Sequence, residues 1–430
     1  MTAPTDQILS SVQAILAAQG LTAEDLAAYA ERSGPAANFP APSYPTLRER
    51  VEKLERGLPK NTKRTWKTHL DRLIEGTPPL CGCLCDSCLD LEAGCCCECT
   101  ACDGSKLKIE VRADLVLTRN SVVQSDVEEW ATVAERHAQK RATAQNKVRV
   151  VSGLKEKPTS GQGGRENAVT AYRRLFRGLV EDGLWDKNPA ERVPKGRRDD
   201  AQRRSMHDWE IDQFIEALVT GGDDPELDLL LGWFALETGA RQGGTISLRL
   251  SRIKPATQMI ELFEKNKKLA DQPVSAELIE ALLAHAAERG GPQCDPTSAT
   301  YDAQSPVFYF GNPRRSRRKG PDGKMVSSDA PAPLTGRRFD TLYKRIQLTL
   351  PWANETGFTN HGVRRTGASI IERIAGNETA RLFLRHGPRT TTQTYTQATL
   401  ERLVEAVSVM TGSSHPLAHS RAMETGDSCR

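Results

Sequence analysis

Residues 359–369 read TNHGVRRTGAS and set His361 and Arg364 three residues apart. The segment predicts a helix, and residues three apart share a helical face, so both side chains are expected on one side of it. Arginine binds phosphate oxygens and histidine transfers protons. The pair therefore favours chemistry on a phosphate group.

Two further segments supply groups for the same chemistry. Residues 384–395 (LRHGPRTTTQTY) carry His386 and, nine residues later, Tyr395, while residues 238–241 (TGAR) carry Arg241. A tyrosine hydroxyl can form a covalent bond to phosphorus while arginines neutralise the phosphate. Each residue taken singly is more often an ordinary core or surface side chain. Together they are the groups needed to attack a phosphodiester without a metal.

Length and composition bound the class of protein. A chain of 430 residues with 38% hydrophobic and 27% charged residues is long enough for about two or three globular domains. No apolar run is long enough to span a membrane, and the first residues lack the basic and apolar regions of a secretion signal. We expect a cytoplasmic protein, and the basic clusters at residues 195–198, 203–204 and 314–319 favour the DNA-containing nucleoid as its location.

The charge distribution favours a nucleic-acid partner more than the net charge of +4 does. Basic clusters occur at residues 195–198, 203–204 and 314–319. Each cation placed on a phosphate releases counterions and so contributes to DNA binding. A solvated basic loop is the alternative for any single cluster.

Helical periodicity dominates the chain. Short strands are expected at 257–263 and 272–275, and residues 106–117 either pair as strands or simply connect. The predicted fold class is mainly α with a small β-sheet in the second half (α+β). The expected divisions are an N-terminal helical segment 1–40, a helical domain 45–195 with a Cys-rich insert 78–105, a basic linker 196–204, a second domain 205–411 and a flexible tail 412–430.

Nine of the eleven cysteines fall in the insert, and two CxxC pairs have the spacing with which thiolates bind one tetrahedral zinc. Disulfides are disfavoured in the cytosol, so a structural zinc is the first interpretation. An Fe–S cluster and a reduced, metal-free loop are the alternatives. The candidate ligands are Cys81, Cys83, Cys85, Cys88, Cys95, Cys96, Cys97, Cys99 and Cys102.

These motifs resemble those of the tyrosine recombinase (phage-type integrase) family, in order and spacing, over roughly residues 45–411. TGAR looks like the first family box, HGVR like the second, and LRH with its downstream tyrosine like the last. The family also has a catalytic lysine in a β-hairpin between the first two boxes. Lys265 is the best positional match, with Lys267 and Lys268 as alternatives.

The resemblance implies a helical core-binding domain followed by a catalytic domain that exchanges DNA strands through a 3′-phosphotyrosyl intermediate, without ATP, metal or other catalytic cofactor. The tyrosine would attack, the arginines would bind the phosphate, the lysine would protonate the leaving oxygen, and the histidines would assist. The implied catalytic residues are Arg241, Lys265, His361, Arg364, His386 and Tyr395.

The implied partners are double-stranded DNA and three further copies of the chain, in a tetramer on two DNA sites of a mobile genetic element, with accessory DNA-binding proteins. The apolar stripe of the helix expected at 400–410 would dock onto a neighbouring protomer, with packing inside its own domain as the alternative. The chain departs from the family pattern at Gly244, Arg385 and Gln397, none of which removes a catalytic group. A type IB topoisomerase and a catalytically silent DNA-binding regulator are the alternative functions.

Overall fold

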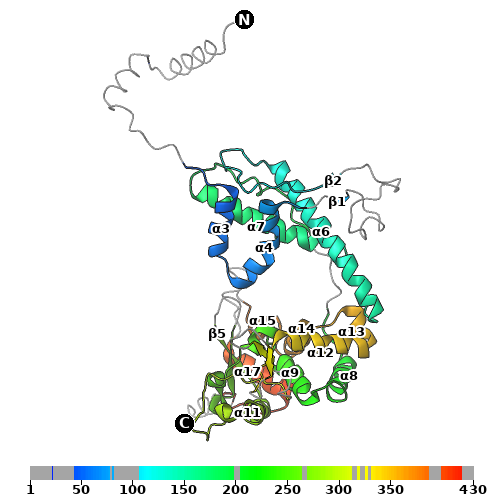
Figure 1. Cartoon of the computed structure of the whole chain (residues 1–430). Coiled ribbons are helices and arrows are strands. Elements are labelled where there is room, and N and C mark those ends of the chain that lie inside the picture. Colours follow the sequence, from blue (N-terminus) through cyan, green and yellow to red (C-terminus); the bar gives the residue numbers. More distant parts are fainter. Residues whose placement is uncertain are drawn as a thin grey trace. The chain divides into compact units, whose positions relative to one another are not determined.

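The computed structural model describes Thr22 and residues 43–77, 80–81, 106–197, 204–263, 269–311, 317–319, 325–327, 331–386 and 399–418. The chain divides into two compact units (Figure 1). The first comprises residues 1–143 and 159–198, and the second comprises residues 144–158 and 199–430. Apart from Thr22, the N-terminal segment expected to be helical lies outside the described residues.

Within the described residues, the first unit has four helices. They are α3 (Leu47–Arg56), α4 (Lys60–Glu75), α6 (Gln124–Val151, of which residues up to Thr143 belong here) and α7 (Gln162–Glu181). A capping box starts α3, because Thr46 accepts from the Glu49 amide and Glu49 accepts from the Thr46 amide. The apolar faces of the helices meet in one core, in which the Phe176 ring stacks between Trp130 and Trp185.

A two-stranded antiparallel pair closes the base of the Cys-rich insert. Strand β1 (Leu80–Cys81) pairs with β2 (Lys106–Leu107), with Leu80 opposite Leu107. The rest of the insert, including eight of the nine clustered cysteines, lies outside the described residues. Among the described residues, no three His, Cys, Asp or Glu side chains gather as a metal site would require.

The second unit is also mainly helical. Its helices are α8 (Asp208–Val219), α9 (Pro225–Thr238), α10 (Gln242–Ile246), α11 (Ala276–Gly290), α12 (Gly336–Thr349), α13 (Pro351–Thr356), α14 (Asn360–Ala375), α15 (Asn377–Phe383) and α17 (Leu400–Thr411). Short 3-10 turns lie at Leu250–Arg252, Pro255–Thr257 and Pro292–Cys294.

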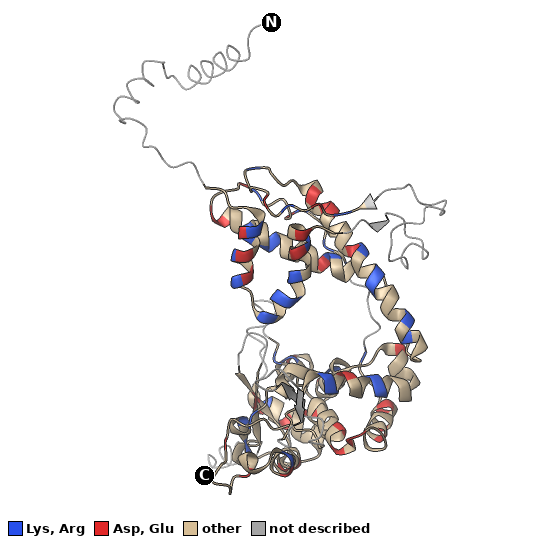
Figure 2. Ribbon diagram, viewed as in Figure 1, with Lys and Arg blue, Asp and Glu red and all other residues tan. Residues whose placement is uncertain are grey.

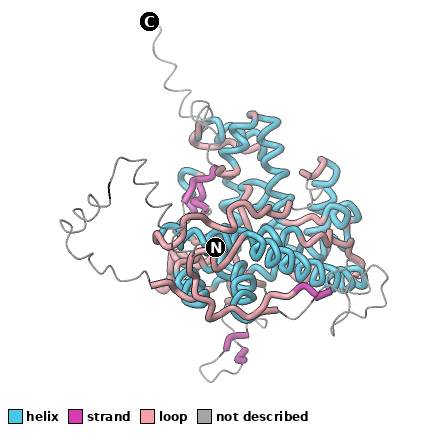
Figure 3. The backbone as a smooth tube through the Cα atoms, turned by 90° about the horizontal axis from the view of Figure 1, so that it is seen from above, coloured by secondary structure: helices cyan, strands magenta, loops and turns pink. Residues whose placement is uncertain are grey.

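A three-stranded antiparallel sheet, in the order β3-β4-β5, lies beside these helices. Its strands are β3 (Ile253–Lys254), β4 (Met259–Phe263) and β5 (Leu269–Pro273). The second strand was predicted at 272–275, but β5 begins three residues earlier. Its first residue, Leu269, pairs with Phe263 of β4. A separate pair joins β6 (Arg317–Lys319) to β7 (Met325–Ser327). The prediction of a mainly α fold with a small sheet is confirmed (Figure 3).

Helix α14 packs closely on α9 and so sets the geometry of the second unit. A Cβ at Gly367 would lie 2.2 Å from the carbonyl oxygen of Leu236, so this approach requires glycine. The expectation that α17 docks onto a neighbouring protomer was wrong for its apolar face. Leu403 and Val407 are buried in a cluster with residues of α14 and α15 in the same unit.

Residues 144–158, at the end of α6 and just beyond it, belong to the second unit and contact α13. The Asn354 side chain accepts from the Lys155 amide at 2.7 Å and donates to the Gly153 carbonyl at 3.0 Å. Lys155 also forms an ion pair with Glu355. Within the described part of the chain, no helix is both long and apolar enough to cross a membrane.

Candidate active site

The end of α9 positions the first arginine. Gly239 caps the helix in the left-handed conformation, with φ of 58°, and a Cβ there would lie 2.6 Å from the Phe383 ring. The chain then turns through buried Ala240 to Arg241, which is the N-cap residue of α10. The Thr-Gly-Ala-Arg motif therefore builds a sharp exit from a buried helix that places Arg241 at the start of the next one.

Arg364 brings the three sequence motifs together. It lies on α14 with only 2% of its surface exposed and donates hydrogen bonds to the carbonyl oxygens of Gly239 and, at 2.5 Å, of Leu384. Its Nη2 atom also lies 3.5 Å from Nε2 of His386. One guanidinium thus contacts the backbone of the first and last motifs, which are far apart in the sequence.

A second layer of hydrogen bonds fixes this arrangement. Asn360, at the start of α14, donates from Nδ2 to the Ala240 carbonyl at 3.2 Å, and the buried Tyr343 hydroxyl donates to Asn360 Oδ1 at 3.1 Å. Because the polar groups are buried, their bonds hold α14 in register with the loop after α9.

Arg385 joins the site, and its role was not predicted. Its φ of 53° is the left-handed conformation that usually requires glycine, the residue common here in the resembled family. The guanidinium donates to the carbonyl oxygens of Thr238, Gly239 and Phe383 and to Oε1 of Gln272, at 2.6–3.0 Å. Arg385 therefore binds the carbonyl oxygens at the end of α9. The one sign of this role in the sequence was the arginine itself, which stands where the resembled family commonly has glycine.

Three guanidinium groups consequently share a small volume. Burial, followed by repulsion from Arg385 and Arg241, lowers the pKa of Arg364 to about 9. Burial and then Arg241 lower the pKa of Arg385 to about 9, and burial lowers the pKa of Arg241. Concentrated positive charge that is partly removed from water favours binding of an anion.

The remaining predicted residues are only partly described. His361 lies exposed in the first turn of α14, and His386 lies exposed directly after Arg385. Lys265, Lys267 and Lys268 fall between β4 and β5 in the sequence, and Tyr395 precedes α17; all four lie outside the described residues. Of the predicted zinc ligands, only the backbone of Cys81 is described.

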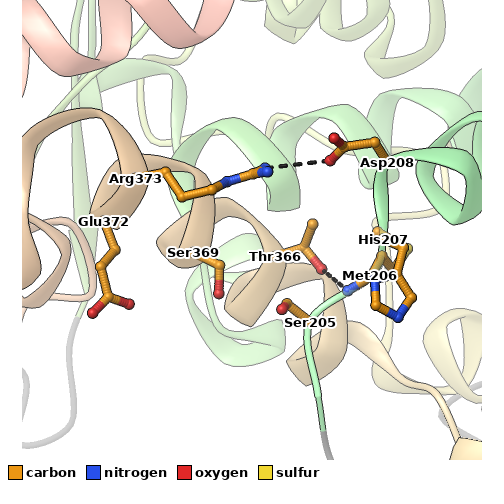
Figure 4. A pocket seen from close by; sticks show the side chains of 8 residues that line it. All are labelled: Ser205, Met206, His207, Asp208, Thr366, Ser369, Glu372 and Arg373. Carbon is orange, nitrogen blue, oxygen red and sulfur yellow. Dashed lines mark hydrogen bonds and ion pairs between the residues drawn. The ribbon is translucent and has the colours of Figure 1, made fainter.

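A pocket of about 510 Å³ lies elsewhere on the same unit, where the chain enters α8 (Figure 4). Thr366 Oγ1 accepts from the Met206 amide at 2.9 Å, and Arg373 pairs with Asp208 at 3.3 Å. At 3.6 residues per turn, Thr366 and Arg373 face away from Arg364 on α14. This pocket is therefore on the opposite face of the helix from the arginine cluster.

The chain matches no protein-family model and no curated protein. Two solved structures of the Tn1549 transposon integrase have the same fold, each at a TM-score of 0.50. The one with transposon right end DNA is 15% identical and covers 86% of this chain and 100% of its own. The one with circular intermediate DNA is 16% identical and covers 83% and 97%.

A lambda integrase dimer bound to a COC′ core site is 13% identical at a TM-score of 0.46, covering 86% of this chain and 85% of its own. The match to the Tn1549 transposon integrase runs through both units described above. The chain therefore has the fold of this integrase, in agreement with the resemblance of its motifs to the tyrosine recombinase (integrase) family.

Proposed function

We propose that this chain is a site-specific DNA recombinase that cuts and rejoins DNA strands through a covalent bond to Tyr395. The observation that carries the proposal is the position of Arg364, which contacts the backbone beside Arg241 and beside His386. A buried guanidinium that joins the three motifs supports one phosphate site built from all of them.

The proposed reaction is an in-line displacement at phosphorus. The Tyr395 oxygen attacks, and its proton passes to His361. A bond forms between that oxygen and phosphorus, while the bond from phosphorus to the 5′ oxygen of the next nucleotide breaks. Lys265 supplies the proton that this leaving oxygen takes up. Arg241 and Arg364 stabilise the negative charge that develops on the non-bridging oxygens.

His386 completes the proposed site by donating a hydrogen bond to the same phosphate. Its position beside Arg364 supports this role. Rejoining reverses the steps: a 5′ hydroxyl attacks the 3′-phosphotyrosyl bond and releases the tyrosine. Because the covalent bond stores the energy of the cut strand, no ATP is required.

Double-stranded DNA is the proposed partner. The two Tn1549 integrase structures contain transposon and circular intermediate DNA, and this supports a DNA substrate for a chain of the same fold. A tetramer on two DNA sites of a mobile element, with accessory DNA-binding proteins, is the proposed assembly. Structural zinc in the Cys-rich insert remains a proposal that rests on the two CxxC pairs.

A trapping experiment tests the function. Duplex fragments that flank the gene in its native element, each carrying one nick, are incubated with the protein and denatured in detergent. A nick beside the cleavage point lets the short product dissociate, so cleavage leaves a stable protein–DNA adduct. The wild-type chain should form adducts on a subset of fragments. If no fragment gives an adduct while several are bound, the chain is a DNA-binding regulator and the proposal is wrong.

A further inference from the structure

Five polar side chains lie close together in the first unit: His69 and Arg72 on α4, His137 and Arg141 on α6, and Tyr172 on α7. His69 and Arg72 are three residues apart and His137 and Arg141 are four apart, so the two members of each pair lie on one face of their helix. These positions extend the faces that carry the core residues of α4, α6 and α7.

The three helices hold these side chains close to one another. Helix α4 packs along α7, and the Tyr172 ring meets Trp130 of α6 edge-on at 5.9 Å. Close to His137, a Cβ at Gly164 of α7 would lie 2.5 Å from the Cβ of Ala138 of α6, so the two helices touch there. The cluster is therefore bounded on three sides by packed helices.

Four of the five side chains present buried polar atoms that lack a hydrogen-bond partner among the described residues. They are His69 Nδ1, Arg72 Nη1, His137 Nε2 and the Tyr172 hydroxyl. Tyr172 has no exposed surface and His69 has 4%. Folded proteins pair nearly all such atoms, with protein or with a bound species. Four unpaired atoms in one cluster point to an occupant.

Charge restricts what that occupant is. Burial, and then Arg72 and Arg141, lower the pKa of His69 and of His137 to about 4, so both rings are neutral near pH 7. Within the described part of the chain, the charged groups that act on either ring are cationic or histidine; none is a carboxylate. Two guanidinium charges repel a metal cation, whereas N–H and O–H donors without acceptors suit an oxyanion.

We propose that these five residues form a binding site for one phosphate-type oxyanion. Arg141 is exposed and marks the entrance, while the Tyr172 hydroxyl forms the floor. The helices around the entrance are rich in Lys and Arg (Figure 2). Helix α6 carries Lys and Arg but no Asp or Glu after Glu135, and α4 carries several further Lys and Arg residues. A phosphate of the DNA backbone and free inorganic phosphate share this chemistry. Only the DNA source rests on the function proposed above.

The first arm of the test uses inorganic phosphate and the full chain without DNA. Calorimetric titration at constant ionic strength, with chloride as the reference, should detect binding by the wild-type protein. Arg72→Gln and Arg141→Gln should each weaken it about tenfold, as expected for loss of one charged hydrogen bond. Arg64→Gln is the matched control, since Arg64 lies exposed on α4 outside the cluster, and it should bind as the wild type does.

The second arm measures binding to a duplex that the wild-type chain binds, over a range of salt. If a DNA phosphate enters the cluster, Arg72→Gln should reduce the slope of log affinity against log salt by about one. Tyr172→Phe should weaken binding with no change in slope, because it removes only a hydroxyl that has no exposed surface. Such a hydroxyl contacts DNA only when a phosphate reaches the floor of the cluster.

If binding of inorganic phosphate requires Arg72, the site exists and its ligand is a free anion. If the variants weaken only the binding of DNA, the ligand is a phosphate of the DNA backbone. If neither arm depends on Arg72, Arg141 or Tyr172 while all variants fold, water satisfies the cluster and the proposal is wrong. All these variants keep Tyr395, so adduct formation reports on the recombinase function separately.

Discussion

Replacing Arg364 with lysine keeps a positive charge at the centre of the candidate site but removes the second donor group. In the wild-type chain, Nη1 donates to the Gly239 carbonyl and Nη2 to the Leu384 carbonyl. A single ammonium on a flexible stem does not span both acceptors while also binding a phosphate with two parallel bonds. Arg364→Lys should therefore lose both stability and cleavage rate.

The magnitudes follow from these contacts. One buried carbonyl left unpaired costs about 1–3 kcal/mol of folding free energy. For a domain of this size that lowers the melting temperature by roughly 2–12 °C. Loss of one preorganised donor to the transition state costs about 2.7–4 kcal/mol, or on the order of 10²–10³ in rate.

The assay is single-turnover formation of the covalent adduct on a nicked duplex at 25 °C, beside a thermal unfolding curve for each protein. Arg373→Lys is the matched control: Arg373 lies on the same helix, exposed, and pairs with Asp208 at 3.3 Å. It should change rate and melting temperature little. Cleavage by Arg364→Lys at the wild-type rate would refute the two-pronged phosphate contact.

Three further outcomes are expected. Arg385→Gly should be more stable than Arg385→Ala by about 1–2 kcal/mol in urea unfolding, because alanine is strained in the left-handed conformation of this residue and glycine is not. The opposite order would show that the backbone relaxes. Leu403→Ala should destabilise the chain by about 2–5 kcal/mol at every protein concentration while Val409→Ala, at an exposed position, should not; a concentration-dependent loss would place α17 on a neighbour instead. Elemental analysis should find about one or two zinc ions per chain, fewer after Cys85 and Cys88 are changed to serine, and a metal-free, folded wild-type protein would contradict the zinc proposal.

The arrangement of the arginine cluster was predictable only in outline from the sequence. Motif order and spacing indicated that Arg241, Arg364 and His386 share one site, since each motif already carries one recognisable group. The bonds from Arg364 to the Gly239 and Leu384 carbonyls depend on how α14 lies against α9. That packing is a tertiary property, set in part by the close approach at Gly367.

Other features were missed for identifiable reasons. Arg385 was noted only as a departure from a glycine, because its contacts with Thr238, Gly239 and Gln272 join residues more than a hundred positions apart. The apolar stripe of α17 indicated that something covers it but not which surface does. Nothing in the sequence pattern indicated that residues 144–158 belong to the second unit, because their contacts include residues 199 positions away, as between Lys155 and Asn354.

Identifying the atom that holds the DNA tests the central claim most directly. The adduct trapped on a nicked duplex is digested with nuclease and protease, and the peptide that retains a nucleotide is sequenced by mass spectrometry. The account predicts one modified residue, Tyr395, joined to a 3′ phosphate, and no adduct from Tyr395→Phe although that variant still binds the duplex. A nucleotide on another residue, a link through a 5′ phosphate, or adducts of normal yield from Tyr395→Phe would contradict it.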